Sequence, residues 1–333
     1  MAPLEARSCR RHECGTHEVK DSGGTGKKAS AAAGWQVIGM SVSALAVAWV
    51  VWQLWDEWPN VVHIFANGSA SAFLVGFALT AISAYATVGP FWILLRRNGA
   101  AGAGFAVAAH IYFVSQLLKH LPGRVWGIGY QAARGKRWSS LSGWVGVNLI
   151  HMALATYVAL ALSSVVVATS CSPAVGALTA FCLALLYASI IPAVRAVHRR
   201  WENAPRLRRL DQFVRSLGHV GFEDWAGIGL LFLLGGVFQY LAWIAFGSAT
   251  GLLVPEHAIH LCALYMLAWF VGWVSLVTPS GLGVREAAFV WLAAGQEAEV
   301  VAAMAVIGRL SLSVADIFLG IAHARSPSGQ ASA

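Results

Sequence analysis

Long stretches of this chain carry no charged side chain, and that feature constrains its fold more than any other. A bilayer hydrocarbon core is about 30 Å thick, which about 20 helical residues cross. Seven runs are long enough, and only the last contains internal charges, Arg309 and Asp316. These runs are Trp35–Trp55, Ser69–Leu95, Leu141–Val167, Ala174–Val194, Trp225–Leu253, Ala258–Val277 and Val300–Ala322. The pattern predicts an all-α membrane bundle.

The composition excludes an ordinary soluble protein of this length. Charged residues make up 11% of the 333 residues and hydrophobic residues 58%, whereas a globular domain carries about 25% charge. A water-facing surface needs that missing charge. The net charge of +8, from 23 Lys and Arg against 15 Asp and Glu, then serves to orient the spans, because basic residues accumulate on the cytoplasmic side of a membrane.

Two stretches do not behave as simple spans, and they decide the topology. Gly102–Leu121 ends at a Pro-Gly break, and Ala287–Gly295 is only about half a bilayer long. If Gly102–Arg137 enters the membrane and returns, every basic loop, including Arg195–Arg215, becomes cytoplasmic. The same treatment makes His260–Gly295 a hairpin from the outside. We therefore expect about seven full spans plus two opposed re-entrant helical hairpins in an inverted-repeat arrangement, with both termini cytoplasmic.

The chain divides into one large membrane region and two short tails. Residues 1–33 are basic and poor in aliphatic side chains, which predicts a disordered cytoplasmic tail. Residues 34–323 form the transmembrane region, and residues 324–333 form a second loose tail. Within the membrane region, residues 198–217 place leucines at helical spacing among arginines. This pattern indicates a cytoplasmic interfacial helix on anionic lipid, although a solvated basic loop is the alternative.

Two similar motifs interrupt apolar helices about 160 residues apart. Each combines proline, which removes a backbone donor, with glycine, which permits irregular dihedrals, and each places an arginine soon afterwards. Irregular backbone at membrane depth survives where it is buried in protein or lines a wet cavity. The predicted breaks are Pro122 and Gly123 in the first motif, and Pro279, Gly281 and Gly283 in the second.

A helix that restarts after such a break presents free N–H groups and a positive dipole end, which suits an anion. Arg124 and Arg285 follow the breaks, so we expect them to bind a phosphate headgroup. Lys119 and His120 precede the first break and are further candidates. The alternative is that both motifs are ordinary interfacial turns whose arginines reach toward water.

Other ionisable groups lie within the predicted membrane region. Arg309 and Asp316 are seven residues apart, about two helical turns on one face. Arg309 could meet Glu286, and Asp316 could meet Arg285 or Lys119. Either structural ion pairing or direct coupling to substrate or protons would explain such charges. For His110 and His151 we expect hydrogen bonds inside the bundle.

The two motifs also carry a family resemblance. The stretches SQLLKHLPGRVWGIGYQ and TPSGLGVREAAFVWLAAG resemble the lysylphosphatidylglycerol synthase transmembrane-region family, over about residues 34–323. This resemblance implies a flippase-type domain like that of the bacterial multiple-peptide-resistance proteins, which move aminoacylated phosphatidylglycerol between leaflets. His120 stands where the family usually has tyrosine, and Ser280 stands where it has glycine. About ten residues follow the last run, so we expect no soluble synthase domain.

The sequence favours transport over catalysis. It contains no P-loop, H-E-x-x-H or G-x-S-x-G motif, and we expect no enzyme activity, cofactor, metal or nucleic-acid partner. The leading hypothesis is translocation of an anionic phospholipid, glycolipid or polyprenyl-phosphate-linked lipid across the bacterial inner membrane. The alternative is a non-transporting membrane partner of a cell-envelope lipid synthase or glycosyltransferase. The oligomeric state stays open.

Overall fold

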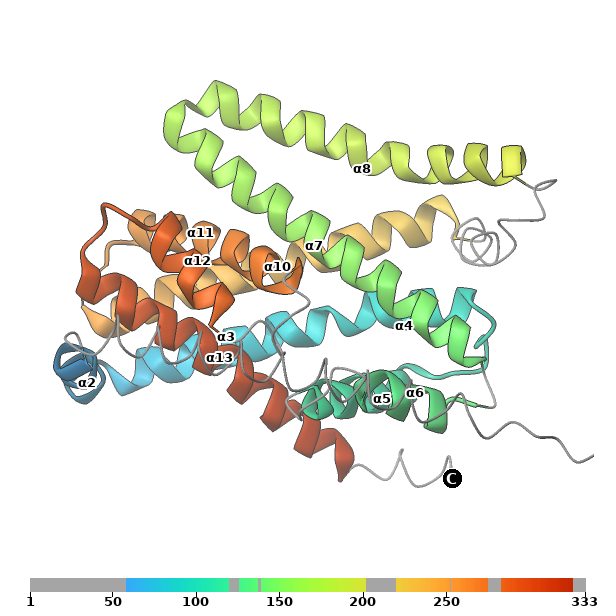
Figure 1. Ribbon diagram of the computed structural model, residues 1–333, viewed down its shortest axis with the longest axis horizontal. Helices are drawn as coiled ribbons and strands as arrows, with labels where there is room; N and C mark the ends of the chain where they lie inside the picture. The colour runs from blue at the N-terminus through green and yellow to red at the C-terminus, as the bar shows by residue number, and fades with distance from the viewer. Residues whose placement is uncertain are drawn as a thin grey trace, which may run out of the picture. The chain divides into compact units, whose positions relative to one another are not determined.

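The computed structural model describes residues 58–119, 126–136, 139–201, 220–251, 253–274 and 283–325, and within them the chain forms helices and no β-strand. The chain divides into residues 1–38 and 39–333, and every described residue belongs to the second unit. Its helices (Figure 1) are α2 (Trp58–Asn67), α3 (Ala70–Ala86), α4 (Val88–Arg97), α5 (Phe105–Leu118), α6 (Trp126–Arg134), α7 (Leu141–Cys171), α8 (Pro173–Trp201), α10 (Phe222–Thr250), α11 (Pro255–Val274), α12 (Val284–Leu292) and α13 (Ala298–Ala324).

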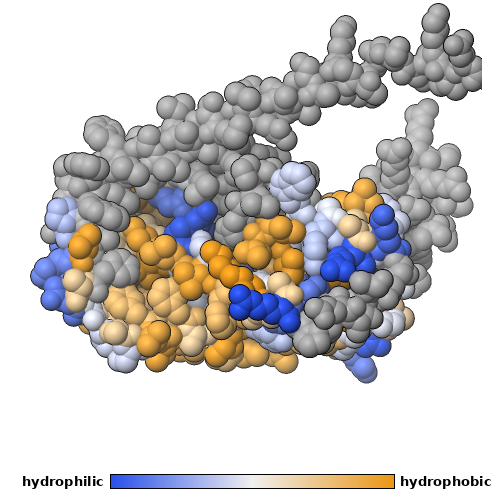
Figure 2. All heavy atoms as spheres, turned by 90° about the horizontal axis from the view of Figure 1, so that it is seen from below, coloured by the Kyte–Doolittle hydropathy of each residue, from blue (hydrophilic) through white to orange (hydrophobic). Residues whose placement is uncertain are grey.

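Among the described residues, six helical segments are long and apolar enough to cross a membrane. They are Ala70–Arg97, Leu141–Cys171, Pro173–Ile190, Phe222–Thr250, Pro255–Val274 and Ala298–Ala324. These segments coincide with six of the seven predicted runs, and hydrophobic residues cover much of one face (Figure 2). The remaining run, Trp35–Trp55, lies outside the described residues, as do the predicted N-terminal tail and most of the predicted interfacial helix, of which residues 198–201 belong to α8. The prediction that the C-terminal tail begins at residue 324 is wrong, because Ala324 is the last residue of α13; residues 326–333 lie outside the described residues.

The first of these segments is divided into two helices at Thr87. Pro90 stands in the first turn of α4 and has no N–H to donate to the carbonyl of Ala86, four residues earlier. The Thr87 hydroxyl instead donates to the Ala84 carbonyl at 2.7 Å. Proline therefore explains the break, and the prediction of one continuous run over Ser69–Leu95 missed it.

Two pairs of neighbouring helices include members too short to cross a bilayer. α5 has 14 residues and α6 and α12 have nine each, which correspond to lengths of about 21 Å and about 14 Å. In each pair the helices run antiparallel. The end of α5 faces the start of α6, because a Cβ atom at Gly127 would lie 2.8 Å from the Ser115 carbonyl oxygen. The end of α11 meets the start of α12 in the same way at Gly272 and Arg285.

The packing of the first half recurs in the second half with the partners exchanged. α5 packs against α6 and also against α13, and α11 packs against α12 and also against α7. The segment α3–α4 and its counterpart α10 lie at the centre, since α3 and α10 share the most extensive contact of any helix pair. Each of the two pairs thus also packs against a long helix from the other part of the chain, α13 for α5 and α7 for α11.

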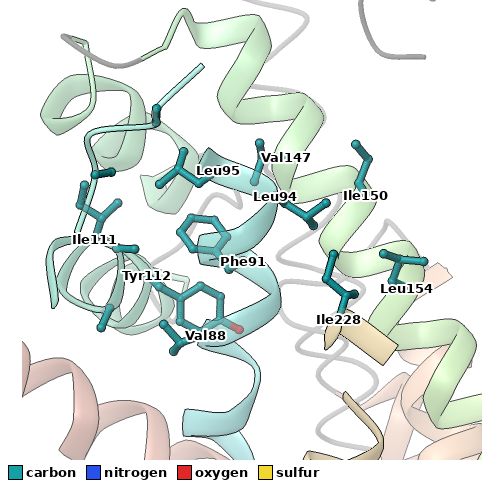
Figure 3. Close-up of a cluster of buried hydrophobic side chains, with 14 of the residues drawn as sticks. Val88, Phe91, Leu94, Leu95, Ile111, Tyr112, Val147, Ile150, Leu154 and Ile228 are labelled. Atoms are coloured by element: carbon teal, nitrogen blue, oxygen red, sulfur yellow. The ribbon is translucent and has the colours of Figure 1, made fainter. Parts of the chain in front are cut away.

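Two hydrophobic clusters fill this bundle. The first joins α4, α5, α7 and α10 around Phe91, with Tyr112, Val147 and Ile228 contributed by the other three helices (Figure 3). The second joins α10, α11, α12 and α13 around the buried aromatic rings of Trp243, Tyr265 and Phe289. The spans differ sharply in burial. In α13, 56% of the most apolar stretch is buried inside the protein, against 6% in α8. α13 is therefore an interior helix and α8 a peripheral one.

Candidate functional site

The second Pro-Gly motif ends in a glycine whose backbone only glycine adopts easily. Gly283 has φ +80° and directly precedes α12, and a side chain at such a dihedral is strained. This geometry turns the chain into the new helix. Pro279 and Gly281 of the same motif lie outside the described residues.

Glu286 holds the start of α12 together. One carboxylate oxygen, Oε2, accepts a hydrogen bond from the Gly283 N–H at 2.8 Å, as acidic side chains in the first turn of a helix commonly do. The other oxygen, Oε1, lies 3.4 Å from Nε of Arg285 and 3.8 Å from Nη1 of Arg309 on α13. Both oxygens of Glu286 are thus engaged within its own site.

This charged cluster is buried within the helix bundle. The exposed fraction of the side chain is 6% for Arg285, 11% for Glu286 and 21% for Arg309. Two guanidinium groups and one carboxylate give these three side chains a formal charge of +1. The contacts of 3.4–3.8 Å are longer than a tight ion pair of about 2.8 Å, so Glu286 offsets part of the positive charge of the two arginines.

Aromatic rings and glycines form the walls of the cluster. The guanidinium carbon of Arg285 lies 5.1 Å from the centroid of the Tyr265 ring, which is cation–π distance. The backbone of α12 can approach α11 because Gly272 has no side chain: a Cβ there would lie 2.9 Å from that of Arg285. The sequence alone gave no indication of this aromatic wall, although Tyr265 stands out as a polar residue inside an apolar run.

A second ion pair lies at the end of the first hairpin. Nζ of Lys119, directly after α5, is 2.7 Å from Oδ2 of Asp316 on α13. It also donates to Gln116 at 2.9 Å. The Lys119 side chain is 42% exposed and that of Asp316 is 13% exposed, so this pair borders the surface of the described structure. His120, Pro122, Gly123 and Arg124, which follow it in the first motif, lie outside the described residues.

α13 therefore carries one charged group to each hairpin. Arg309 faces Glu286 of the α11–α12 hairpin and Asp316 faces Lys119 of the α5–α6 hairpin. The two positions are seven residues apart, about 10 Å along the helix. Of the partners that the sequence left open, the structure pairs Asp316 with Lys119 and Arg309 with Glu286.

The first hairpin contains a neutral network that sequence reasoning missed. Gln131 on α6 donates from Nε2 to the Ser115 hydroxyl at 2.7 Å and accepts from Asn148 Nδ2 on α7 at 2.5 Å. Ser115 in turn donates to the Tyr112 carbonyl at 2.6 Å. Polar residues within apolar segments were the available signal. These side chains bond one another and the backbone, and the bonds fix α6 between α5 and α7.

The prediction of interior hydrogen bonds for two histidines is confirmed. His110 bonds through Nδ1 to the His323 carbonyl at 2.7 Å and through Nε2 to the Tyr130 hydroxyl at 3.0 Å. His151 bonds through Nε2 to the Thr87 carbonyl at 2.9 Å. These side chains tie α5 to α6 and α13, and α7 to the bend between α3 and α4. Within the described ranges, no group of three or more His, Cys, Asp or Glu side chains could hold a metal ion.

No protein-family model, curated protein or solved structure matches the chain.

Proposed function

We propose that this multi-pass membrane protein translocates an anionic lipid between the leaflets of the bacterial inner membrane. The single observation that carries the proposal is the buried Arg285–Glu286–Arg309 cluster at the start of α12. Charged side chains within a membrane region are costly and are usually functional or paired. Two arginines and one glutamate give the three side chains a formal charge of +1 beside a helix N-terminus, and both features attract anions.

The recurring helix contacts support an inverted repeat. α5–α6 and α11–α12 would be two opposed re-entrant hairpins, the first packed against α13 and the second against α7. Both termini would then lie in the cytoplasm. A lipid headgroup would reach Arg285 while its acyl chains stay in the bilayer. Arg124 is the corresponding candidate in the first motif. The cargo would be a phospholipid, a glycolipid or a polyprenyl-phosphate-linked lipid.

Reconstitution tests the proposal directly. The purified full chain is placed in vesicles containing a headgroup- or acyl-labelled fluorescent phosphatidylglycerol, and a membrane-impermeant quencher reports how fast label moves from the inner to the outer leaflet. We expect movement that Arg285→Gln slows at least tenfold, because a charge-assisted contact to phosphate is lost. Arg97→Gln is the matched control, since Arg97 is half exposed and bonds Asp224 outside the cluster.

Two results would contradict the proposal. Vesicles with the wild-type chain that move lipid no faster than empty vesicles would argue against transport by this protein alone. Stable co-purification of the inactive chain with a cell-envelope lipid synthase or glycosyltransferase would then favour the partner hypothesis. If Arg285→Gln and Arg97→Gln moved lipid equally well, transport would stand and the site assignment would be wrong.

A further inference from the structure

Two fully buried polar groups beside the charged cluster lack any hydrogen-bond partner in the described part of the chain. They are the Tyr265 hydroxyl on α11 and the Trp243 indole N–H on α10, both on residues with 0% exposure. Buried polar atoms are nearly always bonded, so an orphaned one calls for an explanation. A hydroxyl and an indole N–H can both donate to a ligand oxygen.

Both groups border the turn of α13 that carries Arg309. A Cβ atom at Gly308 would lie 2.7 Å from the Tyr265 carbon that bears the hydroxyl and 3.0 Å from Cζ2 of Trp243. The two rings are 5.0 Å apart between centroids, and Arg285 lies over the Tyr265 ring. The orphaned donors and the two arginines therefore converge on one region between α10, α11, α12 and α13.

Among the described residues, the carboxylate of this region is that of Glu286, and it lies between two arginines. Both oxygens of Glu286 are engaged, one by Gly283 and the other by the two arginines. The other carboxylates of the described helices lie in their first turns, with one exception. This exception is Asp316 in the interior of α13, which bonds Lys119. The described side chains of this region thus carry two cationic groups, one anionic group and two unpartnered neutral donors, so they favour an anionic oxygen and repel a cationic group on the ligand.

We infer that this region binds a phosphate-bearing headgroup without an ammonium group, with Tyr265 and Trp243 as specificity-determining donors to its oxygens. The inference rests on the proposed function and narrows its substrate class. Phosphatidylglycerol or a polyprenyl phosphate fits, and phosphatidylethanolamine does not. An aminoacylated lipid, the cargo that the family resemblance implies, is disfavoured for the same reason. Glu286 acts as a positioning residue for the arginines and does not contact an amine.

Binding can be measured separately from transport. The full chain in detergent is titrated with dihexanoyl phosphatidylglycerol, dihexanoyl phosphatidylethanolamine or inorganic phosphate, and thermal unfolding reports stabilisation by the ligand. We expect phosphatidylglycerol to bind at least tenfold more tightly than phosphatidylethanolamine. Equal binding of these two lipids would overturn the inference. Equal binding of inorganic phosphate would overturn the assignment to a lipid headgroup.

Aromatic substitutions test the two donors. Tyr265→Phe removes one oxygen atom, whereas Trp243→Phe removes the N–H together with part of a fully buried ring system, so its binding is compared after correction for its loss of stability. Without lipid, we expect Tyr265→Phe to unfold at the wild-type temperature or higher, because no native hydrogen bond is lost. Its affinity for phosphatidylglycerol should fall about tenfold. Tyr240→Phe is the control, because it also removes one tyrosine hydroxyl from the bundle. That hydroxyl has a partner, the Ser163 hydroxyl at 3.4 Å.

An unchanged affinity in both Tyr265→Phe and Trp243→Phe would overturn the inference. The outcome remains separable from failure of the proposed function. A chain that binds phosphatidylglycerol through these donors but moves no lipid would refute transport and retain the site. A chain that moves lipid but binds it without these donors would retain transport and refute the site.

Discussion

The two short hairpins share a backbone arrangement but differ in the chemistry buried between their helices. In α11–α12, the contact with the neighbouring long helix α13 runs through Arg285, Glu286 and Arg309. In α5–α6, the contact with α7 runs through the neutral amides of Gln131 and Asn148. The second residue of the short helix packs against the preceding helix in both hairpins. This residue is Gly127 of α6, against Ser115 of α5, in the first hairpin. It is Arg285 of α12, against Gly272 of α11, in the second hairpin.

This difference separates a structural hairpin from a candidate binding hairpin. An amide network whose described members all have partners specifies geometry and leaves little for a ligand. A buried cluster of two arginines and one glutamate is expensive to desolvate, which makes this hairpin the candidate for ligand binding. Among the described residues, α12 meets α13 through charged side chains and α6 meets α7 through neutral ones, whereas Arg124 of the first motif lies outside the described residues. The ion pair of the first hairpin, Lys119 with Asp316, lies at the surface of the described structure instead.

The largest effect should follow from removing the carboxylate of the charged hairpin. Glu286→Ala leaves two guanidinium groups without their counter-charge and the Gly283 N–H without its acceptor, so we expect a loss of about 3–5 kcal/mol in the free energy of unfolding. Thermal unfolding in detergent, compared at equal protein concentration, measures it. The double variant Glu286→Gln, Arg309→Met should recover part of the loss. A single variant as stable as wild type would show that the carboxylate contributes no net stability.

The neutral network should respond more weakly and without loss of lipid binding. Gln131→Leu leaves the Ser115 hydroxyl and the Asn148 amide short of one partner each, which costs about 1–3 kcal/mol. The same unfolding assay measures the cost, and affinity for phosphatidylglycerol measures the functional consequence. We expect affinity within about twofold of wild type. A Gln131→Leu variant that folds but fails to bind lipid would remove the distinction between the two hairpins.

Much of this comparison could be expected from the sequence and part of it could not. The apolar runs located six helical segments because bilayer thickness fixes their length, and proline with glycine marked both interruptions. The partner of Asp316 could not be chosen, because Lys119 and Arg285 are brought near α13 only by tertiary packing. The network around Gln131 was missed for a related reason, since single polar residues in apolar runs give no periodic signal. Gly89-Pro90 did signal the bend at Thr87 and was overlooked.

Glycine substitutions offer an internal contrast between the two hairpins. Gly283→Ala places a side chain at φ +80°, which should cost about 1–2 kcal/mol in the free energy of unfolding. Gly129→Ala lies within helix α6, where an added Cβ atom meets nothing within 4 Å, so it should stabilise by about 0.5–1 kcal/mol. Shifts of opposite sign in unfolding temperature would check both statements. Equal shifts would mean that α12 tolerates another conformation at its start.

The smallest effect should come from the ion pair of the first hairpin. Lys119 is 42% exposed, so solvent screens its attraction to Asp316, and we expect a coupling free energy of about 0.5 kcal/mol. A double-mutant cycle with Lys119→Met and Asp316→Asn isolates that coupling from the other contacts of each residue. The coupling should decrease further at high salt, because exposed charges are screened within about 10 Å at 0.1 M. A coupling above 2 kcal/mol that salt leaves unchanged would show that this pair behaves like the buried cluster. The contrast between a charged binding hairpin and a neutral structural one would then have to be redrawn, because α13 would connect both hairpins through strong ionic contacts.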